Sequence, residues 1–212
     1  RTKDTDDVDF STGSVGLGVG ATLFGAMARD YVHHHGMAEG RPNGRLVALM
    51  GDAELDEGNV FEALLEGWKH DVRNLWWVID YNRQSLDGVV HDYLFQRIKD
   101  FFGTVGWNVV ELKYGKLQEA AFALPGGDAL RKWIDECPNQ LYAALTFQGG
   151  KAWRDTLKAN LKGAKGLHAF LDEHDDDSLH ALMTNLGGHD MEAILQAFAE
   201  AEGDERPHCF IA

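Results

Sequence analysis

Basic residues, cysteines and long apolar runs are all scarce in this sequence of 212 residues. Lysine and arginine total 20 against 34 aspartate and glutamate residues, which gives a formal net charge of −14. Nucleic acids and anionic membrane surfaces are bound mainly through Lys and Arg, so this acidic balance argues against both as partners. No apolar run approaches the roughly 20 residues that a membrane-spanning helix needs.

The two cysteines and the two ends of the chain give further expectations. Cys137 and Cys209 lie far apart and in no spacing typical of a metal site, so we expect reduced thiols in a cytoplasmic protein. The first residues are polar and contain no apolar signal core, so nothing indicates secretion. The chain begins without Met, and residues 208–212 resemble a strand cut midway. We therefore expect a fragment of a longer polypeptide.

The most informative residues form two polar stretches that each follow an apolar run. Gly51-Asp52-Ala53-Glu54-Leu55-Asp56-Glu57 follows the run 46–50, and Asn82-Arg83-Gln84-Ser85-Leu86-Asp87-Gly88 follows the run 75–79. A helical pattern separates the runs, so we expect parallel strands whose carboxyl ends share one edge of a sheet. Asp52 and Asn82 should converge there. Hard oxygen ligands beside a helix N-terminus suit a magnesium ion that carries a diphosphate.

These stretches resemble the thiamine diphosphate-binding fold of the transketolase-like superfamily. The closer resemblance is to the homodimeric first (decarboxylating) component of the bacterial pyruvate dehydrogenase complex, and it covers nearly the whole chain. That family reads Gly-Asp-Gly-Glu-Met-Asp-Glu in the first stretch and Asn-x-Gln-x-Leu-Asp-Gly in the second. Transketolases share the Asp and the Asn but differ around them. Ala53 departs from the family, which has Gly there, and its methyl group stands where backbone approaches the diphosphate.

Strands alternate with helical patterns along the chain, which predicts an α/β fold with a parallel sheet and helices on both faces. The resemblance makes this the thiamine diphosphate-binding (transketolase-like) fold. Residues 1–212 would form its diphosphate-binding domain. The patterning weakens over 139–180, where we expect a helical insertion. The pyrimidine-binding and C-terminal domains of the family would be absent.

The resemblance also implies a set of ligands for thiamine diphosphate and Mg²⁺. Asp52, Asn82 and the main-chain carbonyl of Gln84 would hold the metal, with two phosphate oxygens and a water molecule completing six ligands. Gly51 and Ala53 would lie against the cofactor beside them. The structural alternative is that Asp52 only caps a helix and Asn82 only forms a turn.

Three further places are candidates. The glycine-rich helix start contributes Gly13 and Val15, which by resemblance line the thiazolium and pyrimidine site, with Ser14 as a plausible N-cap. The alternative there is a helix start without a ligand. His189, in a Gly-Gly-His-Asp run, is a candidate beside the diphosphate or substrate, or else a surface or capping residue. Glu54, Asp56 and Glu57 could serve as a general acid/base pair, but we expect them to shape the loop and the interface, because the cofactor supplies the base in this chemistry.

The implied activity is oxidative decarboxylation of a 2-oxo acid, with pyruvate as the expected substrate. The acetyl unit would pass to a lipoyl-bearing acyltransferase component. A homodimer is expected, because the family assembles its site across a dimer interface, and a Glu of the absent domain activates the cofactor. Two alternatives stay open. One is transketolase-type ketol transfer on sugar phosphates, and the other is a non-catalytic domain that Ala53 prevents from binding cofactor.

Overall fold

The computed structural model describes residues 8–9, 11–81, 84–85, 88–89 and 93–212, with the backbone alone for 84–85, 88–89 and 93–95. The chain divides into two compact units. Residues 1–111 and 197–212 form the first, and residues 112–196 form the second. No helix in the described ranges is long and apolar enough to cross a membrane. Cys137 and Cys209 are both buried, reduced thiols.

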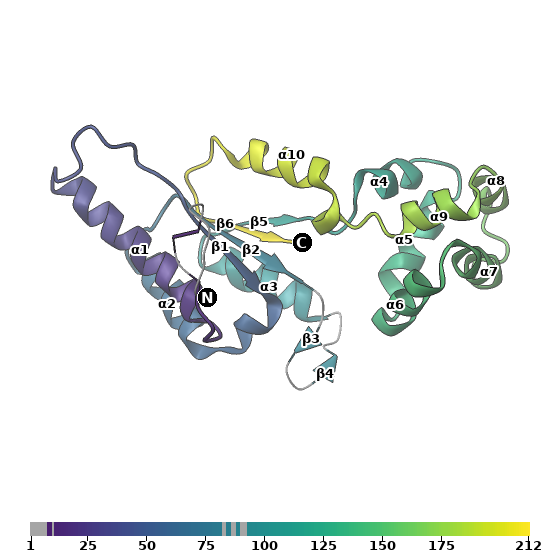
Figure 1. Ribbon diagram of the computed structural model, residues 1–212, viewed down its shortest axis with the longest axis horizontal. Helices are drawn as coiled ribbons and strands as arrows, with labels where there is room; N and C mark the ends of the chain where they lie inside the picture. Colours follow the sequence, from purple (N-terminus) through teal and green to yellow (C-terminus); the bar gives the residue numbers. More distant parts are fainter. Residues whose placement is uncertain (1–7, 10, 82–83, 86–87, 90–92) are drawn as a thin grey trace. The chain divides into compact units, whose positions relative to one another are not determined.

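A four-stranded parallel sheet is the centre of the first unit (Figure 1). In the order β1-β2-β6-β5, its strands are β1 (Leu46–Gly51), β2 (Leu75–Asp80), β6 (His208–Ile211) and β5 (Asn108–Glu111). The apolar runs predicted as strands are confirmed. The last run of the chain lies inside the sheet, between β2 and β5, and all four of its residues are buried. That burial is typical of a parallel strand covered on both faces.

One face of the sheet is covered by three helices: α1 (Leu17–His34), α2 (Gly58–Lys69) and α3 (Tyr93–Thr104). Trp77 of β2 is fully buried between sheet and helices. Its ring packs edge-on against Phe102 of α3 at 6.0 Å and tilted against Trp107 at 4.6 Å. Its indole N–H donates to Thr22 Oγ1 of α1 at 3.1 Å. A buried Trp needs such a partner, so this contact fixes how α1 lies on the sheet.

The other face is covered by the C-terminal part of α10 (Met191–Ala201). Phe198 of this helix packs against Trp76 of β2 at 5.2 Å and against Phe210 of β6 at 4.9 Å. The sheet is therefore parallel with helices on both faces, which confirms the predicted fold class.

The second unit is helical. Its elements are α4 (Lys116–Phe122), α5 (Gly127–Glu136), α6 (Asn139–Gln148), α7 (Gly150–Asn160), α8 (Leu167–Asp172), α9 (Asp176–Met183) and the short 3₁₀ helix η2 (Gly187–His189). Trp153 and Leu157 of α7 are fully buried in its core. Asp175 caps α9 by accepting the Ser178 N–H at 2.7 Å. The segment 139–180 thus contains α6 to α9, and its assignment as an insertion in a diphosphate-binding domain stays a prediction.

Candidate cofactor and metal site

The carboxyl ends of β1 and β2 lie side by side, as predicted. Gly51, the last residue of β1, is in register with Asp80, the last residue of β2. Asp52 follows directly and begins a 3₁₀ helix, η1 (Asp52–Asp56). Its side chain is buried, with the residue only 7 % exposed. A buried carboxylate normally interacts with a partner group or a metal ion, and Asp52 lies at the strand end where the sequence predicts a metal ligand.

Part of the second polar stretch, Gln84–Ser85, lies near the loop that begins at Asp52. Its strand β3 (Gln84–Ser85) packs against η1 and pairs with β4 (Gly88–Val89) in a small antiparallel ribbon. The backbone of Gln84 therefore lies beside the loop that begins at Asp52. Asn82 lies outside the described residues. The strand that contains Gln84 lies against the 3₁₀ helix that begins at Asp52, and the ligand set stays a prediction.

The surroundings of Asp52 fit a ligand that carries oxygen atoms. A Cβ atom built on Gly51 would meet no atom of the described residues within 4 Å, so among these residues there is open space next to the strand end. Asn59, in the first turn of α2, has a buried Oδ1 without a hydrogen-bond partner among the described residues. Buried polar atoms are normally bonded, so an orphan here indicates a missing donor or cation. The donor set of one carboxylate with neutral oxygens suits Mg²⁺ bound together with phosphate.

The glycine-rich loop before α1 is held against this region. Gly13 and Val15 are exposed, and the loop ends at Gly16, the N-cap of α1, with φ of 78°. The expected Ser14 cap is wrong, because its side chain bonds no helix N–H and its carbonyl instead accepts from Leu17. The Gly16 N–H donates to the carboxylate of Glu54, which lies 38 residues away in η1. Glu54 thereby links the glycine-rich loop, which contains Gly13 and Val15, to the loop that begins at Asp52.

His189 lies in the second unit, at the end of η2, and its side chain is exposed. The neighbouring Asp190 has a structural role. It accepts hydrogen bonds from the main-chain N–H of Lys116 at 2.7 Å and of Glu192 at 3.0 Å, and from Asn185 Nδ2 at 3.1 Å. The Lys116 N–H foremost lowers the pKa of the Asp190 carboxyl. Nothing in this unit assigns chemistry to His189, which stays a prediction.

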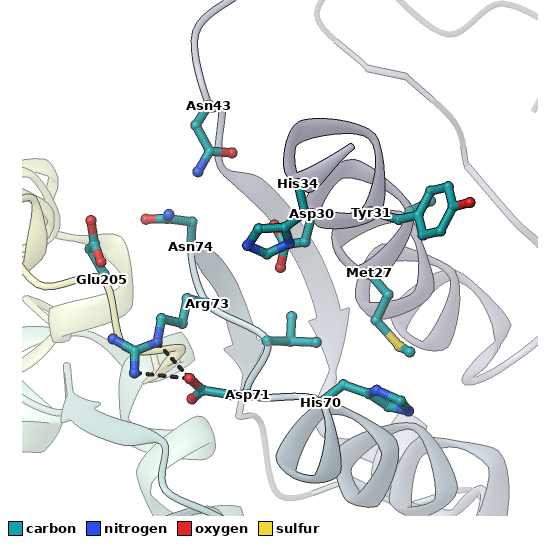
Figure 2. A pocket seen from close by; sticks show the side chains of 12 residues that line it. Met27, Asp30, Tyr31, His34, Asn43, His70, Asp71, Arg73, Asn74 and Glu205 are labelled. Atoms are coloured by element: carbon teal, nitrogen blue, oxygen red, sulfur yellow. Dashed lines mark hydrogen bonds and ion pairs between the residues drawn. The ribbon is translucent and has the colours of Figure 1, made fainter. Parts of the chain in front are cut away.

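A cavity of about 650 Å³ lies at the opposite, amino-terminal edge of the sheet (Figure 2). It is lined from α1, from the turn before β2 and from the loops before β1 and β6. Its lining is polar, but Arg73 donates from Nε and Nη2 to Asp71 Oδ2 at 3.1 and 2.9 Å. No group of three or more His, Cys, Asp or Glu side chains in the described part of the chain is placed to hold a metal ion.

Residues 1–124 match the family described as "Transketolase, thiamine diphosphate binding domain". The chain belongs to this family. The matched residues include both polar stretches and the glycine-rich loop, and the resemblance drawn from the sequence is confirmed.

Curated relatives named "Pyruvate dehydrogenase E1 component" align with almost all of the chain. The protein of Cupriavidus necator is 28% identical over 206 residues, which are 96% of this chain and 22% of that protein. The protein of Escherichia coli K12 is 27% identical over 195 residues, 91% of this chain and 21% of that protein. The protein of Mycobacterium tuberculosis is 28% identical over 199 residues. The chain thus spans about a fifth of the length of these relatives.

Two features of this region escaped prediction from the sequence. The orphan Oδ1 of Asn59 has no sequence signal, because an Asn in the first turn of a helix is common. The bond from Gly16 to Glu54 joins residues far apart, so no local pattern reveals it. The glycine at position 16 was the available signal, since a residue with positive φ at a helix start favours Gly.

Proposed function

We propose that this chain binds Mg²⁺ and the diphosphate of thiamine diphosphate at the carboxyl edge of its sheet. The observation that carries the proposal is the buried Asp52 at the end of β1, beside β3 and the open space at Gly51. Membership of a thiamine diphosphate-binding family supports the same ligand. Residues 1–212 would act as the diphosphate-binding domain, with 139–180 as a helical insertion.

Different residues would bind the metal ion and the rings of the cofactor. Asp52 would give the metal its one protein charge, and Asn82 and the Gln84 carbonyl would add neutral oxygens. Burial of Asp52 keeps water away, which strengthens its attraction for the cation. Gly13 and Val15 would lie against the rings. When bound, thiamine diphosphate supplies a nucleophilic carbon and an electron sink for the loss of carbon dioxide.

The wider function we propose is oxidative decarboxylation of pyruvate with transfer of the acetyl unit to a lipoyl-bearing partner. The relatives named pyruvate dehydrogenase E1 component support this assignment. A cytoplasmic homodimer is part of the proposal, because the sequence resembles a homodimeric family. Ketol transfer is the second candidate, because the matched family is also named for transketolase. Assays of the complete enzyme separate them: pyruvate with an electron acceptor against a pair of sugar phosphates.

The test of cofactor binding is calorimetric titration of the chain with thiamine diphosphate, with Mg²⁺ or with EDTA. We expect binding only with Mg²⁺, and a loss of roughly 100-fold or more in affinity for Asp52→Ala, because the metal loses its only charged ligand. Asp71→Gly is the matched control, since it removes a carboxylate at the other edge of the sheet. Gly adopts the positive φ of Asp71 without strain. Equal affinity of the Asp52→Ala variant and the unchanged chain would refute the proposal.

The 212-residue chain alone should release no carbon dioxide from pyruvate, even with saturating thiamine diphosphate and Mg²⁺. In the family that the sequence resembles, a Glu of another domain activates the cofactor. Release of carbon dioxide by the pure chain would mean that its own residues complete the active site.

A further inference from the structure

The carboxylate of Glu54 accepts a hydrogen bond from the main-chain N–H of Gly16, the N-cap of α1. The first N–H groups of a helix have no partner inside the helix, and an acidic group close to them is favoured by the helix dipole. Glu54 sits in η1, the loop that starts with Asp52. One hydrogen bond therefore connects the glycine-rich loop to the loop of the proposed metal ligand.

The local geometry leaves this contact little freedom. Gly16 is buried and has φ of 78°, and a Cβ atom added to it would lie 2.5 Å from Asn59 Oδ1 and 2.9 Å from Glu57 Cβ. The main chain at Gly16 thus packs against the start of α2. Residues 11–15, by contrast, are exposed at every position. The Gly16 N–H, which donates to Glu54, directly follows this exposed stretch.

We propose that Glu54 is a positioning residue for the cofactor. By holding Gly16, it fixes the loop of Gly13 and Val15 at one place relative to Asp52, so that one ligand can contact both loops. The proposal rests on the proposed function. It differs from a purely structural cap, because a cap would stabilise α1 without changing the affinity of the chain for thiamine diphosphate.

Two variants of Glu54 separate the hydrogen bond from the size of the side chain. Glu54→Gln keeps an oxygen that can accept the Gly16 N–H, whereas Glu54→Met has similar length and no strong acceptor. Glu62→Met is the matched control, because Glu62 lies exposed on α2. Amide hydrogen exchange of the segment around Gly16, measured without ligand, reports the bond. Titration with thiamine diphosphate and Mg²⁺ reports the positioning.

We expect Glu54→Met to speed exchange at Gly16 and in the first turn of α1 by about tenfold and to weaken binding by about tenfold, the effect of one lost hydrogen bond. Glu54→Gln should stay within about threefold of the unchanged chain in both measurements, and Glu62→Met should change neither. Unchanged exchange in Glu54→Met would show that the bond does not hold the loop. Faster exchange with unchanged affinity would reduce Glu54 to a helix cap. If the unchanged chain itself fails to bind, the proposed function fails first, and the positioning role with it.

Discussion

The two edges of the parallel sheet carry similar polar residues but use them in different ways. At the amino edge, the guanidinium of Arg29 donates to the carbonyl oxygens of Gly44, Asn74 and Arg73 at 2.6, 3.2 and 2.8 Å and to the carboxylate of Asp30. At the carboxyl edge, a buried carboxylate, Asp52, borders open space at Gly51. The arginine at the first edge binds its own main chain, and the second edge is where we propose that the ligand binds.

This difference shows why a cavity alone is weak support for a site. The amino-edge cavity has about 650 Å³ and a polar lining, yet its arginine is already paired: the hydrogen bond that Arg73 donates to Asp71 foremost raises the pKa of Arg73. At the start of α2, beside Gly16, the informative atom is Asn59 Oδ1, which is buried and lacks a hydrogen-bond partner among the described residues. A polar atom without a partner is a better indication of a ligand than the size of a hollow.

The largest effect at the amino edge is expected for Arg29→Met. Its side chain is 13% exposed, and its loss removes a donor from the carbonyl oxygens of Gly44, Arg73 and Asn74, of which Asn74 keeps the Leu46 N–H. We expect the first unit to lose about 2 kcal/mol of stability. Hydrogen exchange of β1 and β2 in increasing urea measures this, because it reports on the first unit alone.

The matched control for that variant is Arg73→Met. This guanidinium is half exposed and donates to the exposed carboxylate of Asp71, so its loss should change stability much less. Neither arginine variant should alter the affinity for thiamine diphosphate. If Arg29→Met changed the affinity for thiamine diphosphate but not the stability of the first unit, the amino edge would take part in binding, which would contradict the proposed difference between the two edges.

At the carboxyl edge, Asn82→Ala should weaken binding of thiamine diphosphate by about tenfold at limiting Mg²⁺, less than Asp52→Ala. It removes a neutral metal ligand and leaves the charged one in place. Asn74→Gly gives the comparison at the amino edge, because Asn74 has φ of 52° and Gly adopts that conformation readily. Calorimetric titration should show a loss for Asn82→Ala only. Equal affinities for both variants would mean that Asn82 is not a ligand.

His208, at the amino end of β6, makes the stability of this edge depend on pH. The side chain is fully buried, and burial lowers its pKa from the ordinary 6.5. The unfolded chain then binds more protons just below that pH, so the contribution of His208 is complete above about pH 6.5 and is lost as the pH falls. Asp204 keeps its charge in this range, because Arg206 lowers its pKa to about 2. Arg45 also faces the ring and opposes its protonation.

The measurement is the stability of the first unit at about pH 7.5 and about pH 5.5, for the chain and for His208→Gln. The loss due to His208 is at most about 1.4 kcal/mol for each pH unit below its ordinary pKa. The variant should show a smaller decrease than the unchanged chain over this interval. Equal decreases in both would show that His208 does not cause the pH dependence.

Much of the first unit could be predicted because its strands are continuous apolar runs and its helices show apolar faces. The runs at 46–50 and 75–79 became β1 and β2, and the shared edge of Asp52 and β3 followed from the rule for parallel strands. The place of β6 inside the sheet did not follow from its sequence, because strand order is decided by packing across the whole unit. The α1 cap was mispredicted for a related reason: its partner, Glu54, is distant in sequence.

The smallest expected effect concerns Ala53, where the family that the sequence resembles has Gly. Its methyl group lies in the loop after Asp52, at the residue where the backbone would approach a phosphate. Ala53→Gly should therefore leave the affinity for thiamine diphosphate unchanged or raise it by up to about threefold, since Gly permits a closer approach. Ala53→Val extends the series in the opposite direction and should weaken binding. Titration of the three chains with Mg²⁺ present gives the order Gly, Ala, Val if the loop contacts the diphosphate. A large loss with Gly would instead show that Ala53 supports the conformation of η1, and that this loop binds its ligand differently from the family.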